Sequence, residues 1–246
     1  MRVSPAAWWQ PQAFGQGLPH SLHTVEHATT CSTRNPKVSS PLHLKVSEPV
    51  TKIKLGAATL DEDLARARTA RLGLGPAILL RGDANGAWSE RAAGEALAAL
   101  ESFDFDFVEQ PLPAEDVAGL ARLRRRSTVR IAVDESISTE EGALRVIAAE
   151  AAQVFVLKPA MLGGAARALE IATLARTAGS DVVFSHAFES AVGAHHALHC
   201  AAAWGDARAM HGLRTAGLFV RDVADPVDSH DGLAALTTTA GLGVAP

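Results

Sequence analysis

The sequence predicts an α/β fold whose parallel strands form a barrel, and three observations support this prediction. From about residue 50, short β-branched and aromatic runs alternate with longer segments rich in Ala, Leu, Arg and Glu. This strand-then-helix unit recurs about six times, which favours parallel strands joined by crossover helices. The sequence has neither the GxGxxG nor the GxxxxGK[ST] phosphate turn of open nucleotide-binding sheets. Polar residues recur where predicted strands end, as on the catalytic face of a barrel.

The predicted elements follow one another from residue 51 to residue 212. We expect strands at 51–56, 77–83, 105–109, 130–134, 153–158, 181–185 and 208–212. We expect helices at 60–72, 89–101, 115–126, 139–150, 163–178 and 190–204. Thr59, Ser89 and Thr139 stand just before acidic residues at three of the helix starts. Such residues cap unpaired N–H groups and place negative charge at the positive end of the helix dipole, which supports these three starts.

The first part of the chain has a different composition. Residues 1–49 are rich in Pro, Ser, Thr, His and Gln and show no sustained helical or strand period. We expect an irregular segment there, either a remnant of a capping domain or disordered chain. The expected organisation is therefore residues 1–49 as an irregular segment and residues 50–246 as a barrel domain.

Composition and charge exclude some classes of function. The 246 residues carry a net charge of −4, so no basic surface is forced and a nucleic-acid partner is not expected. The two cysteines, Cys31 and Cys200, form no CxxC pattern, which argues against a disulfide framework or a zinc ribbon. The sequence shows no apolar run of about 18 residues and no signal-peptide core, so we expect no membrane partner and a cytoplasmic location.

Three acidic residues end three consecutive predicted strands. Asp83, Glu109 and Asp134 are spaced 26 and 25 residues apart, one strand–helix unit each. Carboxylates converging on one mouth of a barrel repel one another unless a cation joins them, and hard oxygen ligands suit Mg²⁺. Taken singly, each acid is equally well explained as a helix cap or a solvated turn residue.

Lysines lie on both sides of these acids along the chain. Lys52 and Lys54 are two residues apart on one predicted strand, so both side chains point to the same face. Lys158 ends a strand beyond the acids. A lysine acts as a base only where burial or neighbouring charges lower its pKa, which a metal ion and a second ammonium would do. A lone lysine at a strand end is more commonly a surface residue.

The order of these motifs resembles the muconate-lactonising-enzyme subgroup of the enolase superfamily. The motifs are Lys-x-Lys at 52–54, Asp-Ala-Asn-Gly-Ala-Trp at 83–88, Glu-Gln-Pro at 109–111, Asp-Glu-Ser at 134–136 and Lys-Pro at 158–159. Residues 185–193, Ser-His-Ala-Phe-Glu-Ser-Ala-Val-Gly, resemble the segment after the seventh strand of that family. Residues 211–219, His-Gly-Leu-Arg-Thr-Ala-Gly-Leu-Phe, resemble a stretch typical of o-succinylbenzoate synthases. The resemblance covers roughly residues 50 to 232.

The resemblance implies a fold and a set of site residues. The fold would be an incomplete TIM-type (β/α) barrel whose N-terminal capping domain is missing or degenerate. The roles would be metal ligation by Asp83, Glu109 and Asp134, proton abstraction by Lys54, an opposing cation at Lys158, a supporting cation at Lys52, support of the ligands by Asn85 and Glu135, and contact with the substrate by Ser185 and Ser190. The cofactor would be Mg²⁺, with Mn²⁺ as a substitute.

The implied reaction is the dehydration of a 2-succinyl-6-hydroxycyclohexadiene carboxylate to o-succinylbenzoate in menaquinone biosynthesis. The enzyme would be a hydro-lyase acting on a small carboxylate by lysine proton abstraction and a metal-stabilised enediolate. The same residues also fit an N-acylamino acid racemase, a dipeptide epimerase or a muconate cycloisomerase, in which the two lysines serve a different step. A truncated, non-catalytic product is a further alternative.

Two features depart from the family pattern. No first barrel strand and helix are recognisable just before Lys52. Gly82 precedes the first acidic ligand at a position where an apolar strand residue is usual.

Overall fold

Strands and helices alternate through residues 50–204 in the order that the sequence predicts. The computed structural model describes residues 26–30, 43–44, 50–57, 59–206, 209–213, 219, 221–227, 229–230, 233–236 and 240–244. The alternating elements are β3 (Val50–Lys54), α1 (Leu60–Leu74), β4 (Leu79–Asp83), α2 (Glu90–Leu100), β5 (Phe105–Glu109), α3 (Val117–Arg126), β6 (Ile131–Val133), α4 (Glu140–Ala148), β7 (Val154–Leu157), α5 (Ala165–Thr177), β8 (Asp181–Phe184) and α6 (Ala191–Trp204). Each predicted strand and helix in this stretch is confirmed within a few residues.

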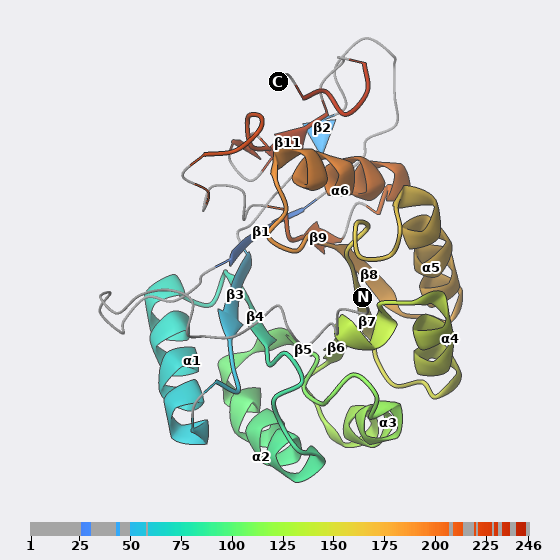
Figure 1. Cartoon of the computed structure of the whole chain (residues 1–246). Coiled ribbons are helices and arrows are strands. Elements are labelled where there is room, and N and C mark those ends of the chain that lie inside the picture. The colour runs from blue at the N-terminus through green and yellow to red at the C-terminus, as the bar shows by residue number, and fades with distance from the viewer. Residues whose placement is uncertain are drawn as a thin grey trace.

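The six strands β3 to β8 are parallel and form a curled sheet with helices outside it (Figure 1). The full strand order is β8-β7-β6-β5-β4-β3-β1-β9, where β1 is Glu26–Thr30 and β9 is Met210–His211. A parallel bridge between Ser185 and Gly212 then connects β8 with the segment after β9, and the Gly212 amide donates to the Phe184 carbonyl at 2.8 Å. The described strands therefore form a closed ring, and the predicted barrel-type α/β fold is confirmed.

Strand β1 was not expected from the composition of residues 1–49. It lies between β3 and β9 in the ring and runs antiparallel to both. A second short strand, β2 (His43–Leu44), pairs with β11 (Leu233–Ala235), which in turn pairs with β10 (Ser229–His230). The rest of the predicted irregular segment lies outside the described residues. Short strands without alternating polarity are recognisable only by their partners, which here lie far away in the sequence.

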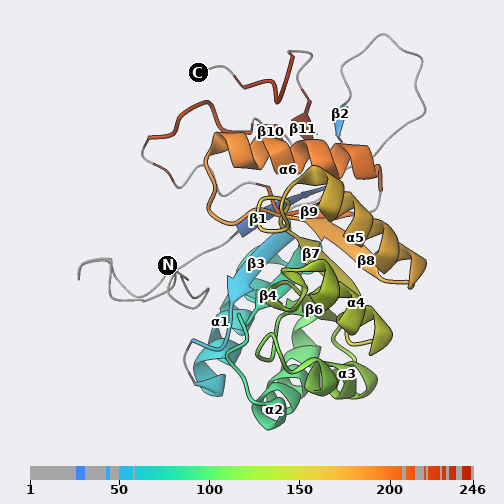
Figure 2. The ribbon, with the colours of Figure 1, turned by 45° about the vertical axis from the view of Figure 1, so that its right-hand side comes forward.

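This second sheet, of β10, β11 and β2, lies next to α6 (Figure 2). Helix α6 itself packs against α5 and β8. Among the helices of the described part of the chain, none combines the length and the apolarity that crossing a membrane requires.

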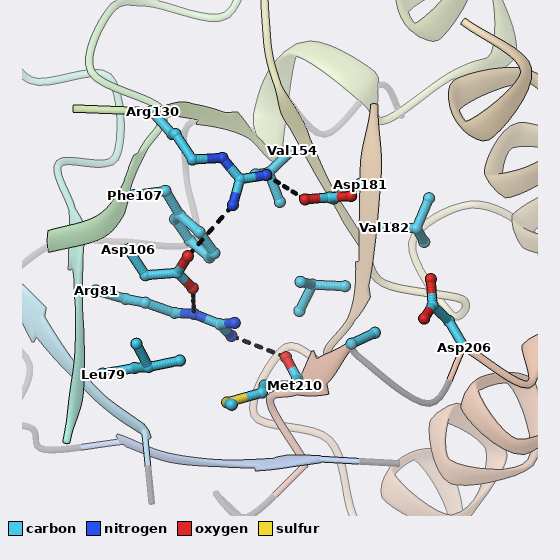
Figure 3. A pocket seen from close by; sticks show the side chains of 12 residues that line it. Leu79, Arg81, Asp106, Phe107, Arg130, Val154, Asp181, Val182, Asp206 and Met210 are labelled. Atoms are coloured by element: carbon cyan, nitrogen blue, oxygen red, sulfur yellow. Dashed lines mark hydrogen bonds and ion pairs between the residues drawn. The ribbon is translucent and has the colours of Figure 1, made fainter. Parts of the chain in front are cut away.

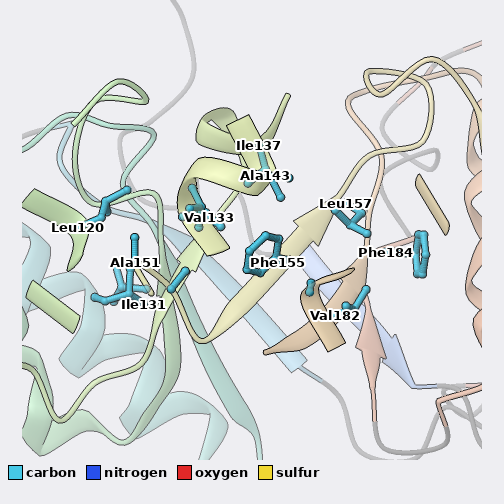
Figure 4. Packing of buried hydrophobic residues seen from close by; sticks show 14 of the residues in the cluster. Leu120, Ile131, Val133, Ile137, Ala143, Ala151, Phe155, Leu157, Val182 and Phe184 are labelled. Carbon is cyan, nitrogen blue, oxygen red and sulfur yellow. The ribbon is translucent and has the colours of Figure 1, made fainter. Parts of the chain in front are cut away.

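The strands separate two apolar regions. Facing outward, Ile131, Val133, Phe155, Leu157 and Phe184 are buried against the helices (Figure 4). A smaller cluster fills the inside of the ring and consists of Phe107, Ala132, Val154, Val156 and Val183. Because successive strand residues point to opposite faces, Ala132 faces inward while its neighbours on β6 face the helices. Nearly continuous apolar strands are expected where both faces of a sheet are covered.

Ion pairs occupy the end of the ring where the strands begin. Arg81 donates to Asp106 at 2.8 Å and to the Met210 carbonyl at 2.8 Å, and its guanidinium lies 4.5 Å from the centre of the Phe107 ring. Arg130 pairs with Asp106 and with Asp181 (Figure 3). These contacts border a hollow of about 200 Å³. Because these charged side chains pair with one another, we interpret this end of the ring as contributing to stability rather than to catalysis.

Candidate active site

The predicted catalytic and metal-ligating residues gather at the opposite end of the ring, where the strands finish. Asp83 and Glu109 are the last residues of β4 and β5, and Asp134 directly follows β6. The parallel register places Lys54 beside Asp83 and Asp83 beside Glu109. Strand register therefore brings Lys54, Asp83 and Glu109 to one level, whereas Asp134 lies two residues beyond Ala132, the register partner of Glu109.

Two lysines of β3 contact the acids of the neighbouring strands. The ammonium of Lys52 lies 3.0 Å from Asp83 Oδ2 and 3.0 Å from Glu109 Oε1. The ammonium of Lys54 donates to the same oxygen of Asp83 at 2.7 Å and to Asn85 Oδ1 at 2.9 Å. The Lys52 side chain is 11% exposed and that of Lys54 is 32% exposed. Of the pair, Lys54 is thus the more accessible from the mouth of the ring.

The other side of the site repeats this pairing. Lys158 follows β7 and donates to Asp134 Oδ2. Asn85 joins the two sides, because its Nδ2 donates to Glu135 Oε1 at 3.0 Å while its Oδ1 accepts from Lys54. The predicted supporting residues therefore lie in the same hydrogen-bonded group as the acids and the lysines.

Burial and crowding of like charges set the protonation of the acids. The pKa of Glu109 is raised to about 8, chiefly by burial and also by the charges of Asp83 and Asp134, while Lys52 opposes the shift. Burial also raises the pKa of Asp83, but Lys52 and Lys54 together outweigh burial and hold this pKa below its usual range. Ionisation of Glu109 is thus disfavoured by burial and by its acidic neighbours, and an added cation would relieve this penalty.

The flanking groups respond to the same charges. Burial acts to lower the pKa of Lys158, but Asp134 and Glu109 together outweigh it, so the net direction is upward. Burial and then the charge of Asp134 raise the pKa of Glu135. A positive charge at Lys158 is therefore the expected resting state of this side of the site.

The chemistry of the donor set fits Mg²⁺. Asp83, Glu109 and Asp134 supply hard carboxylate oxygens from three adjacent strands, which is the ligand type that Mg²⁺ prefers. In the described part of the chain, however, no three acidic, histidine or cysteine side chains already surround one point closely enough to hold an ion. Lysine ammonium groups pair with all three acids, so these side chains would have to rearrange around a metal.

A cavity of about 720 Å³ opens beside this group. Asn85, Asp134, Glu135 and Lys158 form its polar wall. Its apolar wall is formed by Ile137, Val156, Met161 and Leu162. A cavity with convergent polar groups on one wall and apolar side chains on another suits a small carboxylate that also carries an apolar part.

Ser185 and Ser190 do not line this cavity. The Ser185 hydroxyl donates to the Gly212 carbonyl at 3.1 Å, where β8 meets the segment after β9. Ser190 immediately precedes α6. Their contact with a substrate stays a prediction.

One residue at the centre of the site, Gln110, was not predicted from the sequence. It lies between Glu109 and Pro111 in the Glu-Gln-Pro motif and is fully buried. Its side-chain oxygen Oε1 accepts from the backbone amide of Asp134. The available signal was a polar side chain inside an otherwise apolar turn, since a buried amide needs hydrogen-bond partners.

Comparison with known proteins agrees with this geometry. A sequence model of the family described as "Enolase C-terminal domain-like" matches residues 46–246. The chain belongs to the enolase superfamily. A curated o-succinylbenzoate synthase of Mycolicibacterium smegmatis is 42% identical over 194 residues, which are 78% of this chain and 56% of that synthase. The o-succinylbenzoate synthase of Thermobifida fusca is 37% identical over 225 residues, which are 89% of this chain and 69% of that synthase.

Solved structures of the enolase superfamily share the fold. Muconate cycloisomerase from Pseudomonas fluorescens superposes with a TM-score of 0.76 at 30% sequence identity, covering 80% of this chain and 55% of the cycloisomerase. The chain thus spans little more than half the length of several of the relatives that it matches. What the matches share is the superfamily's barrel domain.

Proposed function

We propose that this chain carries the catalytic barrel of a Mg²⁺-dependent o-succinylbenzoate synthase. The observation that carries the proposal is the arrangement at the strand ends, where three acids meet Lys52 and Lys54 on one side and Lys158 on the other. The curated relatives are named o-succinylbenzoate synthase at 37–43% identity, whereas the muconate cycloisomerases among the solved structures are 29–30% identical. The identities therefore favour the synthase over the cycloisomerase.

The proposed chemistry divides the work between the two lysine sides. Lys54, the more exposed lysine of its pair, removes the α-proton of the substrate carboxylate. The same ammonium then returns a proton to the departing hydroxyl, so that one water leaves and the ring becomes aromatic. Lys158 contributes a fixed positive charge from the opposite side of the three acids, and Lys52 offsets the charges of Asp83 and Glu109.

The proposed metal would be held by Asp83, Glu109 and Asp134. When bound, Mg²⁺ would supply positive charge to the carboxylate of the substrate. Asn85 and Glu135 would orient these ligands, since Asn85 contacts Asp83 through its backbone amide at 3.1 Å and Glu135 through its side chain. A role in menaquinone biosynthesis and a cytoplasmic location are further parts of the proposal.

The test is to follow loss of diene absorbance when the purified chain and Mg²⁺ are mixed with the cyclohexadiene precursor of o-succinylbenzoate. We expect turnover that a chelator abolishes and that Lys54→Ala lowers by about 10²–10⁴-fold, the usual contribution of a general base. Arg91→Ala is a control, because this largely exposed residue of α2 lies outside the site.

Unchanged turnover in Lys54→Ala would contradict the assignment of the base. Absence of turnover in a chain that melts cooperatively would contradict the choice of substrate, and N-acylamino acids would then be tested for racemisation. Absence of both turnover and a cooperative melt would contradict an active barrel in this chain.

A further inference from the structure

Gln110 connects the turns that carry the proposed metal ligands. Its side chain is fully buried, and both ends of its amide are hydrogen-bonded. The Oε1 atom accepts from the Asp134 amide at 3.1 Å and from the Ser136 amide at 3.1 Å. The Nε2 atom donates to the Leu112 carbonyl at 2.9 Å and to the Ser136 hydroxyl at 2.7 Å.

The backbone of Gln110 extends this connection to β6 itself and to the turn after β4. Its amide donates to the Ala132 carbonyl of β6 at 2.8 Å, and its carbonyl accepts from the Gly86 amide at 2.7 Å. Gly86 lies in the turn after β4, just beyond Asp83. One residue therefore contacts the turns that follow β4 and β6, while it sits next to Glu109 at the end of β5.

The position of Asp134 depends on this contact. Strand β6 ends at Val133, and Asp134 has φ −131° and ψ −73°, outside both the strand and the helix regions. Its amide is therefore not part of the strand ladder and is taken by the side chain of Gln110. The next turn, a 3₁₀ helix at Glu135–Ile137, is held at its first residues by the same Oε1 atom through Ser136.

Gln110 also has an unfavourable backbone conformation. Its φ is +40°, in the left-handed region that residues with a side chain seldom adopt. Such a conformation persists where the surroundings determine it strongly and is common at functional sites. Here it directs the side chain toward β6 while Glu109, one residue earlier, lies against Lys52.

We propose that Gln110 is a positioning residue that fixes Asp134 relative to Glu109 and so sets the Mg²⁺ affinity of the site. The inference rests on the proposed function, because it takes these two acids as metal ligands. Gln110 carries no charge and acts through the backbone of its neighbours, as groups that orient metal ligands do.

The test is a titration of Mg²⁺ into the purified chain, followed by isothermal calorimetry, with Gln110→Met compared with Gln153→Met. Gln153 is a matched control, because its Oε1 accepts from the Ile131 amide at 2.8 Å, at the opposite end of β6 from the site. Both variants lose side-chain hydrogen bonds to the backbone at one end of β6, so both should melt at a lower temperature. We expect Gln110→Met to weaken Mg²⁺ affinity by about 10–100-fold and Gln153→Met to leave it unchanged.

A second variant keeps the test decisive if Gln110→Met does not fold. Gln110→Asn retains the amide but is one methylene too short to reach both Asp134 and Ser136, so it should weaken Mg²⁺ binding in the same direction. Folded Gln110 variants that bind Mg²⁺ as tightly as the unaltered chain would overturn the inference. An unaltered chain that binds no Mg²⁺ would instead overturn the metal site of the proposed function.

Discussion

His211 illustrates how one buried side chain links the ring closure to pH. It is 1% exposed, its Nδ1 accepts from the Phe184 amide at 3.0 Å, and its Nε2 has no hydrogen-bond partner among the described residues. Burial, reinforced by the charge of Arg81, lowers the pKa of His211 to about 3. The folded protein therefore holds this imidazole neutral at pH values where the unfolded chain protonates it.

The free energy of unfolding should depend on pH through His211. Between about pH 6.5 and pH 3 the unfolded chain binds the extra proton, so stability is full above this window and falls as the pH is lowered. The His211→Asn variant keeps an acceptor for the Phe184 amide. As the pH is lowered from 7 to 4, we expect its free energy of unfolding to fall less than that of the unaltered chain. The difference should be about 1 kcal/mol per pH unit, measured by urea unfolding at pH 7, 6, 5 and 4. Parallel pH profiles for the two proteins would count against a neutral buried His211.

Among the candidate site residues, the charged side chains were predicted from the sequence, but Gln110, which contacts the backbone of Asp134, was not. Asp83, Glu109 and Asp134 were recognisable because each lies at or directly after the end of a strand, and strand ends converge in a barrel. Gln110 was not recognisable, because its role depends on where the turn after β6 lies in space. The hydroxyl of Ser185 donates to the Gly212 carbonyl, a partner that only the closed ring brings near, and its contact with a substrate stays a prediction.

Among the elements, the helix starts were predictable because their caps are encoded locally. The side chains of Thr59, Ser89 and Thr139 accept from the amides of Glu62, Ala92 and Gly142, respectively. By contrast, β6 ends one residue earlier than the predicted strand 130–134, because Gln110 takes the Asp134 amide. A side-chain contact from the turn after β5 determines where β6 ends, so the local sequence pattern does not predict this boundary.

The packing of β4 explains the glycine that precedes the first acid. A Cβ added at Gly82 would lie 2.5 Å from Leu55 Cδ1 and 3.3 Å from side-chain carbons of Phe105 and Val108. Leu55 is buried, so it has little room to move. The apolar group that the family pattern places on β4 is here supplied by the residue after β3.

Two glycine substitutions should therefore have opposite effects. Gly82→Ala should lower the free energy of unfolding by about 1–3 kcal/mol through overpacking. Gly94→Ala is the matched control in α2, where the nearest atom to an added Cβ is Leu123 Cδ2 at 4.0 Å. It should raise the free energy of unfolding by about 1 kcal/mol through helix propensity. Chemical denaturation measures the free energy of unfolding of both variants. An unchanged free energy of unfolding in Gly82→Ala would refute the packing argument.

For the whole molecule, the ring was predictable in part. The succession of six strand–helix units in residues 50–204 determines a parallel sheet with right-handed crossovers. The closure was not predictable, because β1 pairs with β3 on one side and with β9 on the other. The pairing of these distant strands depends on the geometry of the finished sheet, and hydrophobic periodicity along the sequence does not predict it.

If the strand ends bind Mg²⁺, the metal should stabilise the entire fold. At a Mg²⁺ concentration of about 100 times the dissociation constant, binding adds about 2.7 kcal/mol, or roughly 5–10 °C in melting temperature. Asp134→Asn should reduce this shift, whereas Asp61→Asn, an exposed acid on α1, should retain it. Thermal melts with Mg²⁺ and with a chelator measure the effect, and an equal shift in both variants would exclude Asp134 as a ligand.

The closure of the ring also implies an order of assembly. Strands β3 to β8 come from one continuous stretch, and each pairs with the next along the chain. Strands β1 and β9 are separated by about 180 residues, so their pairing must overcome the entropy of a long loop. The contiguous part of the barrel, β3 to β8, is therefore expected to fold first and the closing strands last. Native-state hydrogen exchange should then show the amides of β1 and β9 opening before those of β5 and β7.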